Sequence, residues 1–265
     1  MISEQKQPIS VKWVDNHCHI ENSPEGRNAI AEAKHAGVEK LVNVGTDLAT
    51  SQEALAIAQE FSGSVFSTAG IHPHEASKGI EGIKELLYTP HVVAVGECGL
   101  DYHYNHSPPA TQRAVFAEHI DLAHELDLPL VIHAREAWDE IFTILKAKQP
   151  PSRTVFHCFT GKPEEARSII DFGAWISFTG VVTFRSAPEV AEAAKLVPLD
   201  RLMVETDSPY LSPEPVRKTR PNEPANVVWI ARFLADLHGL EYETFESVTD
   251  GNAERFFGIT IPTPE

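Results

Sequence analysis

Short apolar runs recur along the chain and alternate with amphipathic stretches. Eight runs rich in Val, Ile, Leu and Phe predict β-strands over residues 11–17, 40–45, 64–70, 92–97, 128–134, 154–159, 174–180 and 201–207. Most of them are continuous apolar runs, which is typical of parallel strands buried on both faces.

Helical spacing marks several of the intervening segments. Residues 109–128 carry apolar side chains near the 3.6-residue period and predict a long helix. Residues 23–37 predict a capped helix, with Ser23 as N-cap, Pro24 at the first helical position and Gly37 past the end. Residues 222–239 predict an amphipathic helix, followed by a shorter helical stretch that ends at residues 252–258.

The apolar character of the predicted strands ends near residues 19, 44, 70, 97, 133, 157, 178 and 205, at intervals of about 21 to 36 residues, which bracket the roughly 30 residues of one βα unit. The sequence therefore predicts an α/β fold, a single-domain (β/α)₈ TIM barrel over residues 11–265, after a polar segment at 1–10. The two C-terminal helices are expected to close the outer ring. A doubly wound open sheet is the alternative, but no glycine-rich phosphate fingerprint follows the first strand.

Composition and charge narrow the class of protein. No apolar run approaches the roughly eighteen residues of a membrane span, and the polar first ten residues lack the core of a secretory signal. We therefore expect a cytoplasmic protein, a monomer or weak oligomer with reduced cysteines. The net charge of −16 argues against a broad basic face for nucleic acid, so a polyanionic substrate would be met locally by bound cations.

Residue types that can ligate metals sit at or near the ends of the predicted strands. In a barrel the carboxyl ends of the strands meet at one mouth, so residues far apart in sequence share one pocket. A lone histidine at a strand end is usually hydrogen-bonded in the core, but six histidines and carboxylates together at strand ends indicate a metal site. The six are His17, His19, Glu97, His133, His157 and Asp207.

Strand alternation separates the residues of the first strand. Asp15, His17 and His19 are expected on the face toward the lumen, and Asn16 and Cys18 on the opposite face. Cys98 and Cys158 also follow a candidate ligand by one residue. We therefore expect all three cysteines to be buried packing thiols that face the helices.

Four imidazoles and two carboxylates exceed the needs of one ion, so two divalent ions are expected. His17, His19, Glu97 and Asp207 are assigned to one ion, and Glu97, His133 and His157 to the other, with Glu97 as the bridge. Imidazole-rich sites suit Zn²⁺, Ni²⁺ or Mn²⁺, whereas Mg²⁺ prefers oxygen. Two such ions can activate a water for hydrolysis, with Asp207 as the hypothesised general base.

Further candidates lie in loops at the same end of the barrel. His72 and His74 in "GIHPH" can hold a phosphate or protonate a leaving oxygen, although Pro73 also gives this motif a conformational explanation. Asp101 and His103, expected in the loop after the fourth strand, can support the ligands. Basic residues can contact phosphates, namely Arg135, Lys162, Arg185, Arg217, Lys218 and Arg220. Loop aromatics can stack on unpaired bases, namely Tyr102, Tyr104, Phe159 and Tyr210.

The sequence resembles the TatD family of metal-dependent deoxyribonucleases over nearly its whole length. The matching stretches are "DNHCHI" at 15–20, "GIHPH" at 70–74, "GECGLDYHY" at 96–104, "LPLVIHAREA" at 128–137, "HCFTG" at 157–161, "ETDSPYL" at 205–211 and "RPNEPANV" at 220–227. The resemblance implies a barrel, two divalent ions held by the six residues, and hydrolysis of phosphodiester bonds in DNA.

A metal site at the bottom of a barrel admits one strand better than a duplex, so we expect stepwise action on single-stranded DNA or frayed ends. One alternative is a metallohydrolase of amides, lactones or small phosphoesters, because the same chemistry serves any developing oxyanion. Another is a barrel that has lost catalysis and serves as a binding scaffold, which the presence of all six ligands disfavours.

Overall fold

The structure is a computed structural model and describes residues 12–260. Its secondary structure follows a repeating strand and helix order, with 3₁₀ turns labelled η. The elements are β1 Trp13–Cys18, α1 Pro24–His35, β2 Val38–Val44, α2 Leu48–Glu60, β3 Val65–Ala69, η1 Pro73–Lys78, α3 Ile83–Leu87, β4 Val92–Asp101, α4 Pro109–Leu126, β5 Leu130–Arg135, α5 Trp138–Lys148, β6 Thr154–Phe156, α6 Pro163–Asp171, β7 Trp175–Phe178, η2 Gly180–Thr183, α7 Pro188–Ala194, η3 Leu199–Arg201, β8 Leu202–Val204, η4 Pro224–Asn226, α8 Val227–His238 and α9 Tyr242–Phe257.

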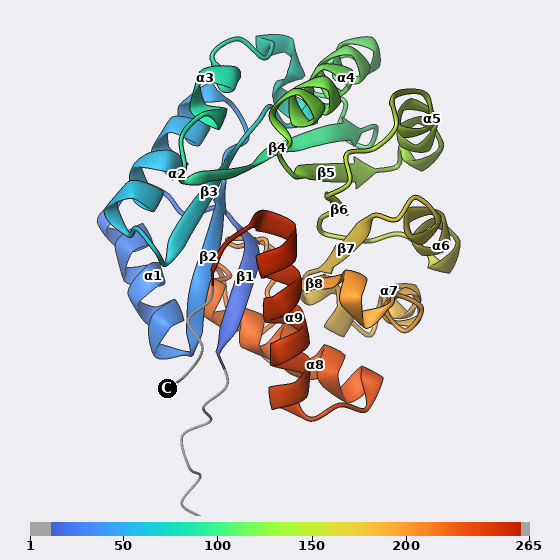
Figure 1. Cartoon of the computed structure of the whole chain (residues 1–265). Coiled ribbons are helices and arrows are strands. Elements are labelled where there is room, and N and C mark those ends of the chain that lie inside the picture. Colours follow the sequence, from blue (N-terminus) through green and yellow to red (C-terminus); the bar gives the residue numbers. More distant parts are fainter. Residues whose placement is uncertain (1–11, 261–265) are drawn as a thin grey trace, which may run out of the picture.

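The eight strands form one parallel sheet in the order β1 to β8, with helices around its outer face (Figure 1). Hydrogen bonds between the end of β1 and the segment after β8 complete the ring. The amide of Asp207 donates to the carbonyl oxygen of His17, and the amide of His19 donates to that of Ser208. The predicted (β/α)₈ barrel is therefore confirmed, and its first and last strands are joined next to the predicted ligands. The polar segment at residues 1–10 lies outside the described residues.

Local sequence signals explain the best-predicted helices. Ser23 caps α1, since its hydroxyl accepts from the amide of Gly26, and Gly37 follows the helix at φ 92°. The predicted long helix is α4. The last helix was expected to be shorter than the one before it. This was wrong, because α9 has 16 residues and α8 has 12.

Two layers of apolar side chains build the core. One lies between the sheet and the helices, and the other fills the lower part of the barrel lumen with valines such as Val14, Val42 and Val131. Phe256 and Phe257 at the end of α9 belong to this lumen layer, and Figure 1 shows α9 lying across the barrel near β1 and β8. The C-terminal helix thus does more than complete the outer ring, because it also packs into the barrel.

The fourth strand is longer than its apolar pattern indicates. β4 continues past Glu97 to Asp101, so the placement of Asp101 in a following loop was wrong. The extension pairs closely with β5, where a Cβ added to Gly99 would lie 2.1 Å from the carbonyl oxygen of His133. Gly99 has φ +136°, a conformation that glycine adopts readily. The extension carries the carboxylate of Asp101 to the site.

Candidate metal centre

A cavity of about 760 Å³ opens at the carboxyl ends of the strands. Its walls come from segments that follow β1 to β8, as the predicted mouth requires. Five of the six predicted ligands line it, and the sixth, His17, lies beneath them against Glu97. The fold thus brings all six together.

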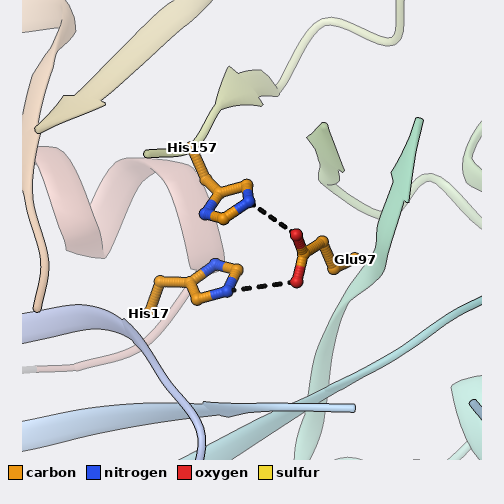
Figure 2. A group of neighbouring side chains, drawn as sticks. All are labelled: His17, Glu97 and His157. Atoms are coloured by element: carbon orange, nitrogen blue, oxygen red, sulfur yellow. Dashed lines mark ion pairs between the residues drawn. The ribbon is translucent and has the colours of Figure 1, made fainter. Parts of the chain in front are cut away.

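Glu97 stands at the centre of this group, and its carboxylate is 3% exposed. Its Oε2 lies 3.4 Å from Nε2 of His17, and its Oε1 lies 2.6 Å from Nε2 of His157 (Figure 2). Oε1 also lies 3.0 Å from Nδ1 of His133 and 3.5 Å from Nε2 of His72. The two oxygens therefore face two different sets of imidazoles.

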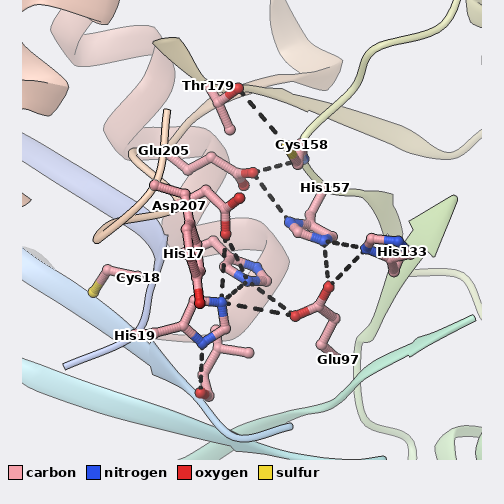
Figure 3. Close-up of polar contacts among 12 residues, drawn as sticks. His17, Cys18, His19, Glu97, His133, His157, Cys158, Thr179, Glu205 and Asp207 are labelled. Atoms are coloured by element: carbon pink, nitrogen blue, oxygen red, sulfur yellow. Dashed lines mark hydrogen bonds and ion pairs between the residues drawn. The ribbon is translucent and has the colours of Figure 1, made fainter. Parts of the chain in front are cut away.

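The first set combines β1 with the segment after β8. Nε2 of His17 and Nε2 of His19 are 3.3 Å apart, and Nε2 of His19 is 3.4 Å from Oδ1 of Asp207 (Figure 3). Tetrahedral coordination with ligand distances of about 2.1 Å places donor atoms about 3.4 Å from one another. The donor set and its spacing therefore fit one divalent cation.

The second set lies on the other side of Glu97. Nε2 of His157 is 3.4 Å from Nδ1 of His133, and both nitrogens face Oε1 of Glu97. Donor atoms of His72, Glu97 and His133 also lie within 4.8 Å of one another. This set fits a cation as well, and it includes His72, a residue that the sequence suggested only for substrate.

The far nitrogens of three imidazoles are held by acceptors. Nδ1 of His19 is 3.1 Å from the carbonyl oxygen of Val44, and Nδ1 of His157 is 3.3 Å from Oε1 of Glu205. Nε2 of His133 is 3.2 Å from Oδ2 of Asp101. Such contacts fix the tautomer and turn the other ring nitrogen toward the centre.

The electrostatics of the cluster favour an ionised carboxylate core. Burial opposes ionisation, yet the charges of His157 and His72 and hydrogen bonds from neighbouring imidazoles hold the pKa of Glu97 well below its usual value. Burial likewise opposes ionisation of Asp207, but its contact with His19 lowers the pKa. Burial, and secondarily the neighbouring His157, lowers the pKa of His17, which favours the neutral imidazole that binds metals.

The floor of the site departs from simple strand alternation. The pairing of β1 with β2 is irregular between Asp15 and Cys18. Asn16 therefore lies beside His17 among lumen residues such as Val131 and Met203, and its predicted placement toward the helices was wrong. The carboxylate of Asp15 accepts from the hydroxyl and the amide of Thr206 and from the backbone amide of His17, and no hydrogen bond between it and an imidazole is found among the described residues.

The cysteines divide into two kinds. Cys18 and Cys98 are fully buried in the layer between sheet and helices, as predicted. Cys158 is only partly buried and lines the main cavity, so its predicted position toward the helices was wrong. Its backbone takes φ 45°, and its amide donates to Oε1 of Glu205, which turns this residue out of the strand pattern. Burial raises the pKa of the Cys158 thiol, which keeps it protonated.

The residues predicted to contact substrate fall into two groups, those that line the cavity and those that do not. His72, His74 and Arg135 line the cavity. Lys162 and Arg220 are exposed and are not part of its lining. Two of the four aromatics, Tyr104 and Tyr210, line the cavity and are 50% and 61% exposed. The other two do not: Phe159 is buried in the core, and the hydroxyl of Tyr102 donates to Glu140.

Sequence reasoning missed Glu205. Its carboxylate is 1% exposed and lies under the imidazole of His157, and its Oε2 has no hydrogen-bond partner among the described residues. A signal was available, because Glu205 and Asp207 are two residues apart in "ETD" and alternation puts them on one face.

A barrel that gathers imidazoles around a buried carboxylate at the carboxyl ends of its strands has the construction of a metal-dependent hydrolase. Comparison with known proteins agrees. The family model for TatD related DNase matches residues 14–258. The chain is 38% identical to the metal-dependent hydrolase YabD of Bacillus subtilis, over 92% of this chain and 98% of the relative.

Two further comparisons bear on sequence and fold. The chain is 40% identical to the 3′-5′ ssDNA/RNA exonuclease TatD of Klebsiella pneumoniae, over 88% of this chain and 91% of the relative. The crystal structure of the TatD homologue YjjV from Escherichia coli superposes with a TM-score of 0.86 at 26% identity, covering 94% of this chain and 98% of that one. The chain therefore belongs to the TatD family.

No helix in residues 12–260 has the length and apolar character needed to cross a membrane.

Proposed function

We propose that this protein is a divalent-metal-dependent hydrolase that removes nucleotides from the 3′ end of single-stranded DNA. The observation that carries the proposal is Glu97, whose two oxygens face two separate imidazole sets at the bottom of one cavity. The relatives named as 3′-5′ ssDNA/RNA exonucleases support the substrate class and direction. A cavity closed at its base by the barrel admits a strand end more readily than a duplex.

Six residues are proposed to hold two ions, with Glu97 shared. His17, His19 and Asp207 complete the first site, and His133 and His157 complete the second. Ions bound by these residues would supply a nucleophile at neutral pH and charge stabilisation for the attacking and leaving oxygens of a phosphodiester. Zn²⁺, Mn²⁺, Ni²⁺ and Mg²⁺ are the candidates, and the imidazole content favours the first three.

The side chains of this protein orient and move protons in the proposed reaction. Asp207 is partly exposed to the cavity and, being held ionised, is the proposed proton acceptor. Asp101 and Glu205 act as positioning residues, because each fixes the far nitrogen of one imidazole. His72 and His74 lie above the second set, where a substrate phosphate would be bound, and Oδ2 of Asp101 holds Nε2 of His74 at 2.9 Å.

Add-back of metal to stripped protein tests the proposal. Apo-protein is incubated with single-stranded and duplex oligonucleotides labelled at the 5′ end, with Mg²⁺, Mn²⁺ or Zn²⁺ restored. We expect a ladder of products shortened from the 3′ end of the single strand, and no products from Glu97→Gln protein. Hydrolysis of amides or lactones without any cleavage of oligonucleotides would instead favour the small-molecule alternative.

A further inference from the structure

The charged side chains of the cavity wall are unevenly distributed. Of the described lysines and arginines, Arg135 alone lines the cavity, whereas two exposed carboxylates of the rim, Glu21 and Glu53, line it as well. Glu75 is a third, but it is paired with Lys78 at 2.7 Å. A long polyanion held along the whole rim would therefore meet more negative charge than positive.

The two kinds of charge lie on opposite sides of the mouth. Glu21 follows β1 and Glu53 belongs to α2, whereas Arg135 ends β5. In the order β1 to β8, strands β2 to β4 separate β1 from β5 on one side of the ring, and β6 to β8 separate them on the other. The arginine thus faces the carboxylates across the cavity.

Arg135 is held in place without a carboxylate partner. Its guanidinium lies 4.7 Å from the ring centroid of Tyr104, and no salt bridge to it is found among the described residues. Tyr104 itself is stacked with His106 at a centroid distance of 5.7 Å and an interplanar angle of 8°. A cation positioned by stacking keeps its N–H donors available for a phosphate.

The side of the mouth that carries Glu21 and Glu53 also has an aromatic ring that can stack on a base. Tyr210 is 61% exposed, lines the cavity and meets the imidazole of His19 edge to face at 6.4 Å. Exposed tyrosine rings stack on unpaired bases, and carboxylates accept hydrogen bonds from sugar hydroxyls. This wall suits a nucleoside and disfavours a phosphate.

We propose that Glu21 and Glu53 select a strand terminus that ends in a free hydroxyl over one that ends in a phosphate, while Arg135 binds the phosphate on the 5′ side of the scissile bond. The proposal rests on the proposed exonuclease function and names the end that the cavity takes. The terminal nucleoside lies between the carboxylates and Tyr210, and the rest of the strand leaves past Arg135.

The first test compares strand ends. Single-stranded decanucleotides with a 3′-hydroxyl or a 3′-phosphate are given to the metal-loaded enzyme, and we expect the hydroxyl end to be shortened roughly tenfold faster, since like charges at a partly exposed site repel. The Glu21→Gln/Glu53→Gln double variant should lose most of that preference by accelerating on the phosphate end. Glu81→Gln/Glu85→Gln removes the same charge from exposed positions outside the cavity lining and should keep the preference.

The second test uses strand length. A dinucleoside monophosphate has only the scissile phosphate, so Arg135→Ala should leave its kcat/KM within about twofold of wild type, while a trinucleotide should lose roughly tenfold or more. Equal rates on both ends, or an equal loss on both lengths, would overturn the inference. Cleavage of none of these substrates with any metal would instead refute the proposed function.

Discussion

His119 offers a quantitative test of how the second half of the site is supported. This histidine on α4 is fully buried, its Nδ1 lies 2.7 Å from the carbonyl oxygen of Val115, and its Nε2 accepts from the amide of Ile71 at 2.9 Å. Ile71 directly precedes His72. The contact requires an unprotonated Nε2, so the position of the "GIHPH" segment depends on a neutral imidazole.

Burial lowers the pKa of His119 from 6.5 to about 4. Between pH 6.5 and about pH 4, the unfolded chain therefore binds a proton at this histidine that the folded chain does not bind. The free energy of unfolding consequently rises with pH over this range. The full shift corresponds to about 3 kcal/mol, of which about 2 kcal/mol is lost by pH 5. No solvent screening reduces this figure, because the side chain is 0% exposed.

Urea unfolding at pH 7.5 and pH 5.0 measures the effect, with His119→Gln as the reference. Gln keeps an acceptor for the Ile71 amide but does not titrate. The drop in the free energy of unfolding from pH 7.5 to pH 5.0 should therefore be smaller in the variant than in wild type by about 2 kcal/mol. The metal-site histidines titrate in both proteins and cancel in the difference. Equal losses in the two proteins would refute the assignment of a neutral, buried His119.

Three further predictions follow from the site. Glu97→Gln should lower the metal content of purified protein measured by mass spectrometry, since it removes the charge shared by both sets. Gly99→Ala should lower the free energy of unfolding by about 3 kcal/mol or more in a urea titration, because its Cβ would meet the carbonyl oxygen of His133. Cys18→Ala/Cys98→Ala should keep the metal content and turnover of wild type, whereas a thiolate site would lose metal.

The fold was predictable because each level of the pattern agreed with the next. Buried parallel strands are apolar throughout, so all eight were visible as runs, and the barrel then placed their carboxyl ends together. The same rule brought His133 and His157 to one place from different strands. Positions set by regular geometry could thus be read from the sequence.

Residues set by loops and helices could not be read in this way. His72 reaches Oε1 of Glu97 from the turn after β3, and Glu53 reaches the rim from α2, and neither placement has a periodicity in the sequence. The net charge of the chain also gives no information on which side of the mouth carries Arg135 and which carries Glu21 and Glu53. The sequence suggested Arg135 as a basic residue at the mouth that can contact phosphates, but its pairing with Tyr104 depends on the packing of a loop.

The irregular end of β1 shows where strand alternation fails beside the metal site. Residues two apart on a regular strand have their Cα atoms about 6.8 Å apart and their side chains on one face, and imidazoles are long enough to converge from there on one ion. Nε2 of His17 and Nε2 of His19 are 3.3 Å apart, as such a pair requires. The departure lies just before this pair, because the pairing of β1 with β2 is irregular between Asp15 and Cys18, and it turns Asn16 toward the lumen beside His17.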